Sequence, residues 1–281
     1  MVYIFYFWFF LFGLIIGSFL NVLILRYHTG ITIFGRSFCF SCGHKLSWKD
    51  LFPLASYVFL KGKCRFCKSD ISKQYVTVEI LTGILFTLVF WKLGGPESLL
   101  NSLIAEGTSP YYFFEFLFFS VIFSILLIIG AYDLKHKIIP DSFAFVFAGL
   151  ALFRVLFLPE TFLFVPTFWD LLAGPILALP LALLWWYSDG RWIGLGDAKL
   201  SLGIGWFLGL ANGFASIVLS FWVGAIVGVL LILAEKMSRK ASWGKKVTLK
   251  SEVPFAPFLI LGFYAAAFFP ALATAVFHLF V

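Results

Sequence analysis

Residues 1–25 contain no charged side chain and are apolar almost throughout. An α-helix of that length rises about 37 Å, enough to cross a hydrocarbon core of roughly 30 Å. The run is too long for the apolar part of a cleavable signal peptide, and no basic residue precedes it. Several similar runs follow along the chain. Lipid offers the backbone no hydrogen-bonding partner, so such runs satisfy their N–H and C=O groups internally, as helices.

The composition agrees with a chain that lies mostly in a membrane. Hydrophobic residues make up 62% of the sequence and charged residues 12%, about half the charge of an ordinary soluble domain. We therefore predict an all-α polytopic membrane protein with about eight transmembrane helices. The expected helices lie near 3–25, 76–91, 112–132, 139–158, 169–187, 198–210, 214–234 and 254–280.

The basic residues predict how the chain is oriented. Nineteen of the 21 lysines and arginines fall in alternate loops, and only Lys92 and Arg154 fall towards the other side. By the positive-inside rule the basic side is cytoplasmic, so both termini are expected to be extracytoplasmic. The net charge of +7 is then assigned to loops that meet anionic lipid headgroups, and we predict no nucleic-acid partner.

The polar segment 26–75 carries two C-x-x-C pairs separated by 21 residues, with the sulfur atoms of Cys39, Cys42, Cys64 and Cys67. This spacing favours a four-thiolate site of the zinc-ribbon kind, which leaves no open coordination position and is therefore structural. Two disulfides or redox thiols are weaker alternatives in a reducing cytoplasm. His44 would be a fifth ligand, which a four-thiolate site does not need. We expect three parts: a first transmembrane helix (1–25), a small cytoplasmic zinc module (26–75) between the first two transmembrane helices, and a membrane core (76–281).

Asp197 ends the segment Gly194-Leu195-Gly196-Asp197, which precedes an apolar run of 13 residues. That run rises only about 20 Å as a helix, so Asp197 is expected below the membrane surface, facing protein or a wet cavity. An ionisable group at that depth is a functional candidate. The alternative is that Asp197 only caps the next helix by accepting hydrogen bonds from its first N–H groups.

Asp133 is a second carboxylate expected at the same membrane face. It follows the predicted helix 112–132, at the end where the helix dipole disfavours negative charge, whereas Asp141 is expected to start the next helix. If Asp133 and Asp197 meet around a water molecule, one can act as base and the other as acid, as in aspartic proteases. Two unrelated helix caps and a proton-relaying transporter remain alternatives, as does a zinc-bearing scaffold.

The motifs together resemble those of the type IV prepilin leader peptidases, bacterial intramembrane aspartic proteases that also process type II secretion pseudopilins. The resemblance rests on the paired cysteines and on Gly17-Ser18-Phe19-Leu20-Asn21-Val22 with Arg26, Ile71-Ser72 through Val78-Glu79, Asp133 with Ile139-Pro140-Asp141, Gly194-Leu195-Gly196-Asp197 with Lys199-Leu200, and Pro254-Phe255-Ala256-Pro257-Phe258.

The resemblance implies that Asp133 and Asp197 are catalytic and cleave a prepilin after a glycine, at the cytoplasmic face of the bacterial inner membrane. It also implies N-methylation of the new amine with S-adenosylmethionine as co-substrate, an activity linked to the amino-terminal part. Glu79 is a candidate for that methyltransferase site, and no glycine-rich nucleotide loop supports it independently. A peptidase without methyltransferase activity is the alternative.

Three departures from the family pattern leave both aspartates untouched. Phe40 replaces a usual proline, Gln74-Tyr75-Val76-Thr77 replaces a usual Arg-Tyr-Pro-Leu, and Ala256 replaces a common glycine. Because a prepilin leader is basic, we hypothesise that local acids such as Glu79 or Glu252 meet it. Glu79 has a simpler alternative, in which it snorkels or pairs with a nearby lysine.

Overall fold

The structure is a computed structural model that describes residues 2–104, 109–157, 168–237 and 254–280. The chain divides into two compact units, Met1–Ile128 and Ile129–Val281. Within the described residues, five helices are long and apolar enough to cross a membrane, or six if α9 and α10 form one broken span. An all-helical membrane protein is confirmed, whereas the count of about eight and the three-part organisation stay predictions.

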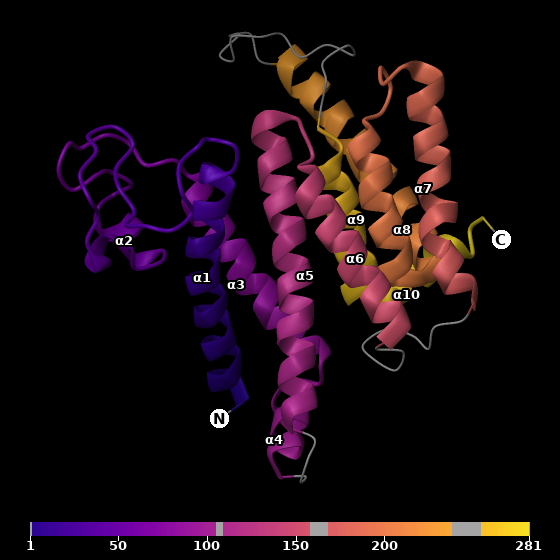
Figure 1. The fold of residues 1–281 in the computed structure, drawn as a ribbon, viewed down its shortest axis with the longest axis horizontal. Helices are drawn as coiled ribbons and strands as arrows, with labels where there is room; N and C mark the ends of the chain where they lie inside the picture. The colour runs from indigo at the N-terminus through magenta and orange to yellow at the C-terminus, as the bar shows by residue number, and fades with distance from the viewer. Residues whose placement is uncertain (1, 105–108, 158–167, 238–253, 281) are drawn as a thin grey trace. The chain divides into compact units, whose positions relative to one another are not determined.

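Unit 1 is built on a pair of packed helices (Figure 1). Its elements are α1 (Val2–Arg26), a 3-10 turn η1 (Trp48–Asp50), α2 (Ala55–Phe59), α3 (Gln74–Lys92), α4 (Gly95–Ile104) and the first part of α5 (Ser109–His136). The segment 95–104, between the predicted helices 76–91 and 112–132, is helical because its apolar positions fall on one face, with Leu99 buried.

Glycines let α1 and α3 approach closely. A Cβ atom on Gly13 would lie 2.7 Å from the Cα of Gly83, and one on Gly17 would lie 2.7 Å from the Cα of Glu79. Side-chain hydrogen bonding adds to the contact, because Asn21 Nδ2 donates to the Tyr75 carbonyl at 3.0 Å. Asn21 therefore links the two helices.

Unit 2 contains the end of α5, α6 (Asp141–Phe157), α7 (Phe168–Ser188), α8 (Leu195–Met237), α9 (Ala256–Phe268) and α10 (Pro270–Phe277). α8 joins two helices across a kink at Gly209, whose φ of 75° and ψ of 178° suit glycine. The break expected at 211–213 therefore lies two residues earlier, and 211–213 are helical. α9 and α10 meet at an angle of 107°.

Two backbone breaks in unit 2 have side-chain donors, which a membrane interior favours. Pro175 within α7 has no N–H to donate to the Leu171 carbonyl, and the Trp206 indole donates to that carbonyl instead, at 2.8 Å. At the kink of α8, the buried Arg154 donates to the Phe207 carbonyl at 2.6 Å. α6, with 17 residues, rises about 26 Å.

Candidate functional site

Asp197 lies in the first turn of α8, which begins at Leu195 and not at Ala198. Its side chain is 6% exposed, and Oδ2 accepts a hydrogen bond from the Gly194 N–H at 3.2 Å. The Asp197 N–H donates to the Gly194 carbonyl at 3.1 Å. Asp197 therefore caps the helix in a different way from the one expected. Its carboxylate accepts from the N–H of Gly194, which precedes the helix, and not from the N–H groups that follow it.

Gly196 brings a second chain segment to this turn. A Cβ atom there would lie 2.8 Å from the Cβ of Ile139, so a side chain would push away the connection between α5 and α6. The glycine before the aspartate therefore allows the ends of α5 and α8 to meet.

Asp133 lies in the last turn of α5, which runs one turn beyond the predicted end and stops at His136. Its side chain is 4% exposed and accepts a hydrogen bond from the backbone N–H of Ala256, at the start of α9. In the sequence analysis Ala256 appeared only as part of a motif. In the structure its backbone N–H orients the carboxylate of Asp133.

Both aspartates line a single cavity of about 1030 Å³ within unit 2. Apolar side chains on its wall include Phe221, Phe255 and Phe258. The structure therefore brings together the two carboxylates that the sequence placed on different helices, 64 positions apart.

Lys199 and Asp141 form an ion pair on the wall of the same cavity, with 2.7 Å between Nζ and Oδ1. Asp141 starts α6, as predicted. Lys199 also lies over the ring of Phe145, 5.3 Å from its centroid. This link between α6 and the first turns of α8 was not predicted. The only signal for it in the sequence is a lysine two positions after the aspartate.

The four cysteines of unit 1 form one cluster, with all sulfur atoms within 4.8 Å of one another. Sγ of Cys39 and Sγ of Cys67 are 3.9 Å apart, close to the ~3.8 Å between ligands of a tetrahedral zinc site with bonds of about 2.3 Å. All four are free thiols, so the disulfide alternative does not apply to this structure. His44 is outside the cluster and packs on Phe66, with 3.5 Å between ring centroids.

The two cysteine turns share one backbone geometry. In each turn the backbone N–H of the first cysteine donates a hydrogen bond to the carbonyl five residues later. Cys39 donates to His44, and Cys64 donates to Ser69. The residue after each second cysteine has positive φ, 69° at Gly43 and 59° at Lys68. N–H groups at such turns point at the sulfur atoms.

These donors favour the metal-binding thiolate form at Cys39 and Cys67. The backbone N–H of Cys42 is the largest influence that lowers the pKa of Cys39, to about 6. The Ser69 hydroxyl, 3.1 Å from Sγ of Cys67, lowers the pKa of that thiol.

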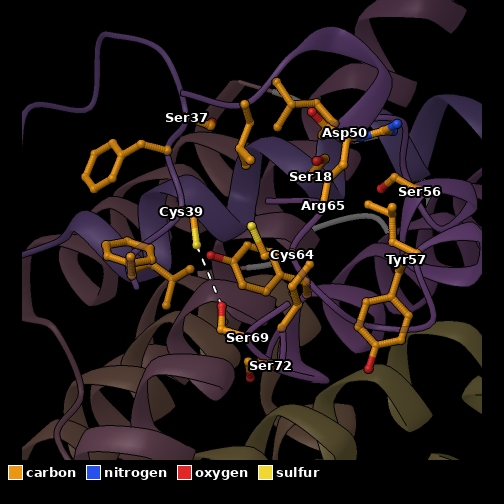
Figure 2. A pocket seen from close by; sticks show the side chains of 18 of the residues that line it. Ser18, Ser37, Cys39, Asp50, Ser56, Tyr57, Cys64, Arg65, Ser69 and Ser72 are labelled. Atoms are coloured by element: carbon orange, nitrogen blue, oxygen red, sulfur yellow. Dashed lines mark hydrogen bonds and ion pairs between the residues drawn. The ribbon is translucent and has the colours of Figure 1, made fainter. Parts of the chain in front are cut away.

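A second cavity, of about 340 Å³, lies within unit 1 (Figure 2). Cys39 and Cys64 are on its wall, as are Ser18 of α1 and Glu79 of α3. Glu79 is 6% exposed and accepts a hydrogen bond from the Leu54 N–H at 2.8 Å. The snorkelling or lysine-paired position considered for Glu79 is therefore wrong. Glu252 lies outside the described residues.

Comparison with known proteins decides the family. A family model described as "Bacterial Peptidase A24 N-terminal domain" matches residues 11–93, and one described as "Type IV leader peptidase family" matches residues 120–229. A Klebsiella pneumoniae protein named "Prepilin leader peptidase/N-methyltransferase" is 32% identical over 213 residues, which cover 71% of this chain and 83% of that protein. The chain belongs to the type IV leader peptidase family.

Other proteins with the same name resemble the chain over most of its length. The Myxococcus xanthus protein is 32% identical over 80% of this chain and 62% of its own length. The Bacillus subtilis protein is 28% identical over 90% of each. No solved structure matches the chain significantly. The amino-terminal match contains the cysteine cluster and Glu79, and the second match contains both aspartates.

Proposed function

We propose that the protein cleaves the leader peptide of type IV prepilins or type II secretion pseudopilins, with Asp133 and Asp197 as the catalytic residues. The observation that carries the proposal is that two buried carboxylates from different helices line one cavity. The names of its relatives, prepilin leader peptidase/N-methyltransferase, support the same reaction. They favour a protease over a transporter or a scaffold.

In this mechanism the pair holds one proton, because closely placed carboxylates do not both ionise readily. The ionised member takes a proton from water as the water oxygen attacks the peptide carbonyl carbon. The protonated member donates its proton to the carbonyl oxygen. When the C–N bond breaks, the leaving amine takes a proton from the first carboxyl group, and one hydroxyl of the tetrahedral intermediate returns a proton to the second carboxylate as the product carboxyl group forms. The backbone N–H groups of Gly194 and Ala256 orient the two carboxylates for these transfers.

Replacement of either aspartate by asparagine tests this proposal. Cleavage of a prepilin by the purified protein should fall by about 10²–10⁴-fold in Asp133→Asn and in Asp197→Asn, because neither carboxyl group can serve as base and acid in one step. Asp189→Asn is the matched control, since that side chain is 84% exposed and should be dispensable. Near-normal cleavage by either catalytic-site variant at normal expression would contradict the mechanism.

The cysteine cluster is proposed to hold one structural Zn²⁺ through Cys39, Cys42, Cys64 and Cys67. Four sulfur atoms within 4.8 Å and two donors that favour thiolates fit this ion. Bound zinc supplies folding free energy to a segment with few buried apolar side chains, and leaves no open position for substrate. Elemental analysis should find about one zinc per chain and a lower content in Cys64→Ser.

The relatives' names also support N-methylation of the amine exposed by cleavage, with S-adenosylmethionine as methyl donor. The protein is proposed to reside in the bacterial inner membrane, with both termini extracytoplasmic and both sites facing the cytoplasm. Mass measurement of a prepilin incubated with protein and S-adenosylmethionine tests both reactions. A product that is cut but not methylated would support the alternative, a peptidase that has no methyltransferase activity.

A further inference from the structure

The cavity of unit 1 has the character of a small-molecule site. Its volume of about 340 Å³ lies in the range of pockets that enclose ligands of drug size. Much of its wall is apolar or aromatic, with Phe38, Tyr57 and Tyr75 among the lining residues, and a few polar groups converge on it. Figure 2 shows the labelled serines and the two cysteines around the hollow.

Glu79 is the unusual group on this wall. A carboxylate that is 6% exposed costs free energy unless it is paired, and its hydrogen-bond donors in the described chain, the Leu54 N–H and the Ser18 hydroxyl, are both neutral. Among the residues that the structure describes, no lysine, arginine or histidine forms an ion pair with it. An ionisable group buried within a membrane segment is by default a functional candidate.

The cationic side chains on the same wall are engaged elsewhere. The Arg26 guanidinium donates to the carbonyls of Thr32 and Ile33, at 2.9 and 3.3 Å, and lies over the Phe38 ring. Arg65 pairs with Asp50 at 2.7 Å. Neither arginine neutralises Glu79, so the cavity retains an unmatched negative group.

The backbone around Glu79 is built to hold that group in place. Leu54 has φ 58° and ψ −49°, a costly conformation for a residue with a side chain, and its N–H is the donor to Glu79. On the other side, Gly17 allows α1 to lie against the Glu79 backbone. Strain on one side and a close helix approach on the other restrict where the carboxylate can be.

We propose that this cavity binds the methyl donor, with the Glu79 carboxylate facing its positively charged sulfonium. The inference rests on the N-methylation part of the proposed function. A cationic sulfonium matches the unpaired carboxylate, and a nucleoside ring matches the aromatic wall. When bound, the donor supplies a methyl carbon whose bond to sulfur breaks, with the electron pair remaining on sulfur, as the substrate amine forms its new bond to that carbon. The amine then gives a proton to water.

Ligand binding in the absence of any prepilin tests the inference. Calorimetry on the zinc-loaded, detergent-purified full chain would compare S-adenosylmethionine with S-adenosylhomocysteine, which lacks the methyl group and the positive charge. The wild type should bind the cationic ligand more tightly. In Glu79→Gln the affinity for S-adenosylmethionine should fall at least about tenfold while that for S-adenosylhomocysteine changes little, because only the charge pairing is lost.

Two further variants make the result specific. Glu115→Gln makes the same change in another membrane helix of unit 1, away from the cavity wall, and should bind both ligands as the wild type does. Ser56→Leu fills the cavity from α2 without a change of charge and should weaken both ligands alike. Zinc content and elution volume verify that each variant is folded.

The outcomes separate this inference from the peptidase proposal. Asp197→Asn should lose cleavage but bind both ligands normally, and Glu79→Gln should keep cleavage. A Glu79→Gln protein that retains the wild-type preference for the cationic ligand would overturn the inference. So would a wild type that cleaves prepilin but binds neither ligand. Lost cleavage in Glu79→Gln with intact ligand binding would instead assign Glu79 to leader recognition.

Discussion

The carboxylates of Asp133 and Asp197 are held by backbone N–H groups rather than by cations. Among the described residues, neither forms an ion pair. A lysine or arginine at either carboxylate would favour the doubly ionised pair, which cannot donate a proton. Neutral donors orient the oxygens and leave the proton free to move between the two groups, as acid–base catalysis requires.

The Asp141–Lys199 pair is expected to position Asp197 without taking part in proton transfer. The two side chains are 64% and 22% exposed, so the pair stabilises the start of α8 only modestly. Asp141→Asn and Lys199→Gln should each lower kcat for cleavage by less than about tenfold, with KM little changed. The double variant should be no slower than the worse single variant, since both changes remove one interaction. Additive losses would contradict a shared function.

The two cysteine turns differ at the residue that needs positive φ. Gly43→Ala should speed zinc loss to a chelator, because a side chain in this conformation costs about 1 kcal/mol, or roughly fivefold in an equilibrium constant. Lys68→Gly should slow zinc loss by a similar factor, because it removes that cost from the second turn. Gly30→Ala is a control with positive φ outside the cluster. Slower zinc loss in Gly43→Ala, or faster zinc loss in Lys68→Gly, would contradict the shared geometry.

At the scale of elements, α7 and α8 of unit 2 are joined where each departs from helical regularity. Trp206→Phe keeps the packing of the ring but leaves the Leu171 carbonyl without its donor, and should cost about 1–3 kcal/mol of stability. Pro175→Ala supplies a backbone N–H four positions after Leu171. Trp206→Phe should therefore lower the melting temperature less in a Pro175→Ala background than in the wild type. An equal decrease in both backgrounds would show that the indole bond does not substitute for the missing helix bond.

At the scale of the whole molecule, the predicted orientation can be tested with an impermeant maleimide. Asn101→Cys in α4 should react in intact cells, because the connection between α3 and α5 is predicted to be extracytoplasmic. Arg191→Cys, between α7 and α8, should react only after the membrane is opened. Both side chains are exposed, so access rather than burial decides the result. The reverse pattern would invert the topology.

Metal removal should affect the two proposed activities unequally. The cysteines belong to unit 1, and Cys39 and Cys64 line its cavity, whereas both aspartates belong to unit 2. Chelation should therefore weaken the binding of S-adenosylmethionine more than it slows cleavage of a short prepilin peptide. Zinc readdition should restore the binding. Equal loss of both activities would mean that unit 2 depends on the metal for its fold.

Much of the element pattern and the candidate residues could be read from the sequence. Apolar runs near 20 residues must become helices in lipid, whatever their neighbours, so the helical class followed from length and hydropathy alone. The C-x-x-C spacing predicted the cysteine cluster because a tight turn places both sulfur atoms on one side. Helix ends were less predictable, since α5 continues past Asp133 and α8 starts before Ala198 through hydrogen bonds that local composition does not reveal.

What only the tertiary structure decided is which groups meet. Asp133 and Asp197 share a cavity because Gly196 lets the α5–α6 connection approach the start of α8. Glu79 is buried without a cationic partner because Gly17 brings α1 against α3 and Leu54 directs its N–H at the carboxylate. Such contacts depend on close approach between segments far apart in the chain, and periodicity or composition within one segment holds no information about them. The sequence by itself determined the helices and the chemistry available, and the packing decided where that chemistry gathers.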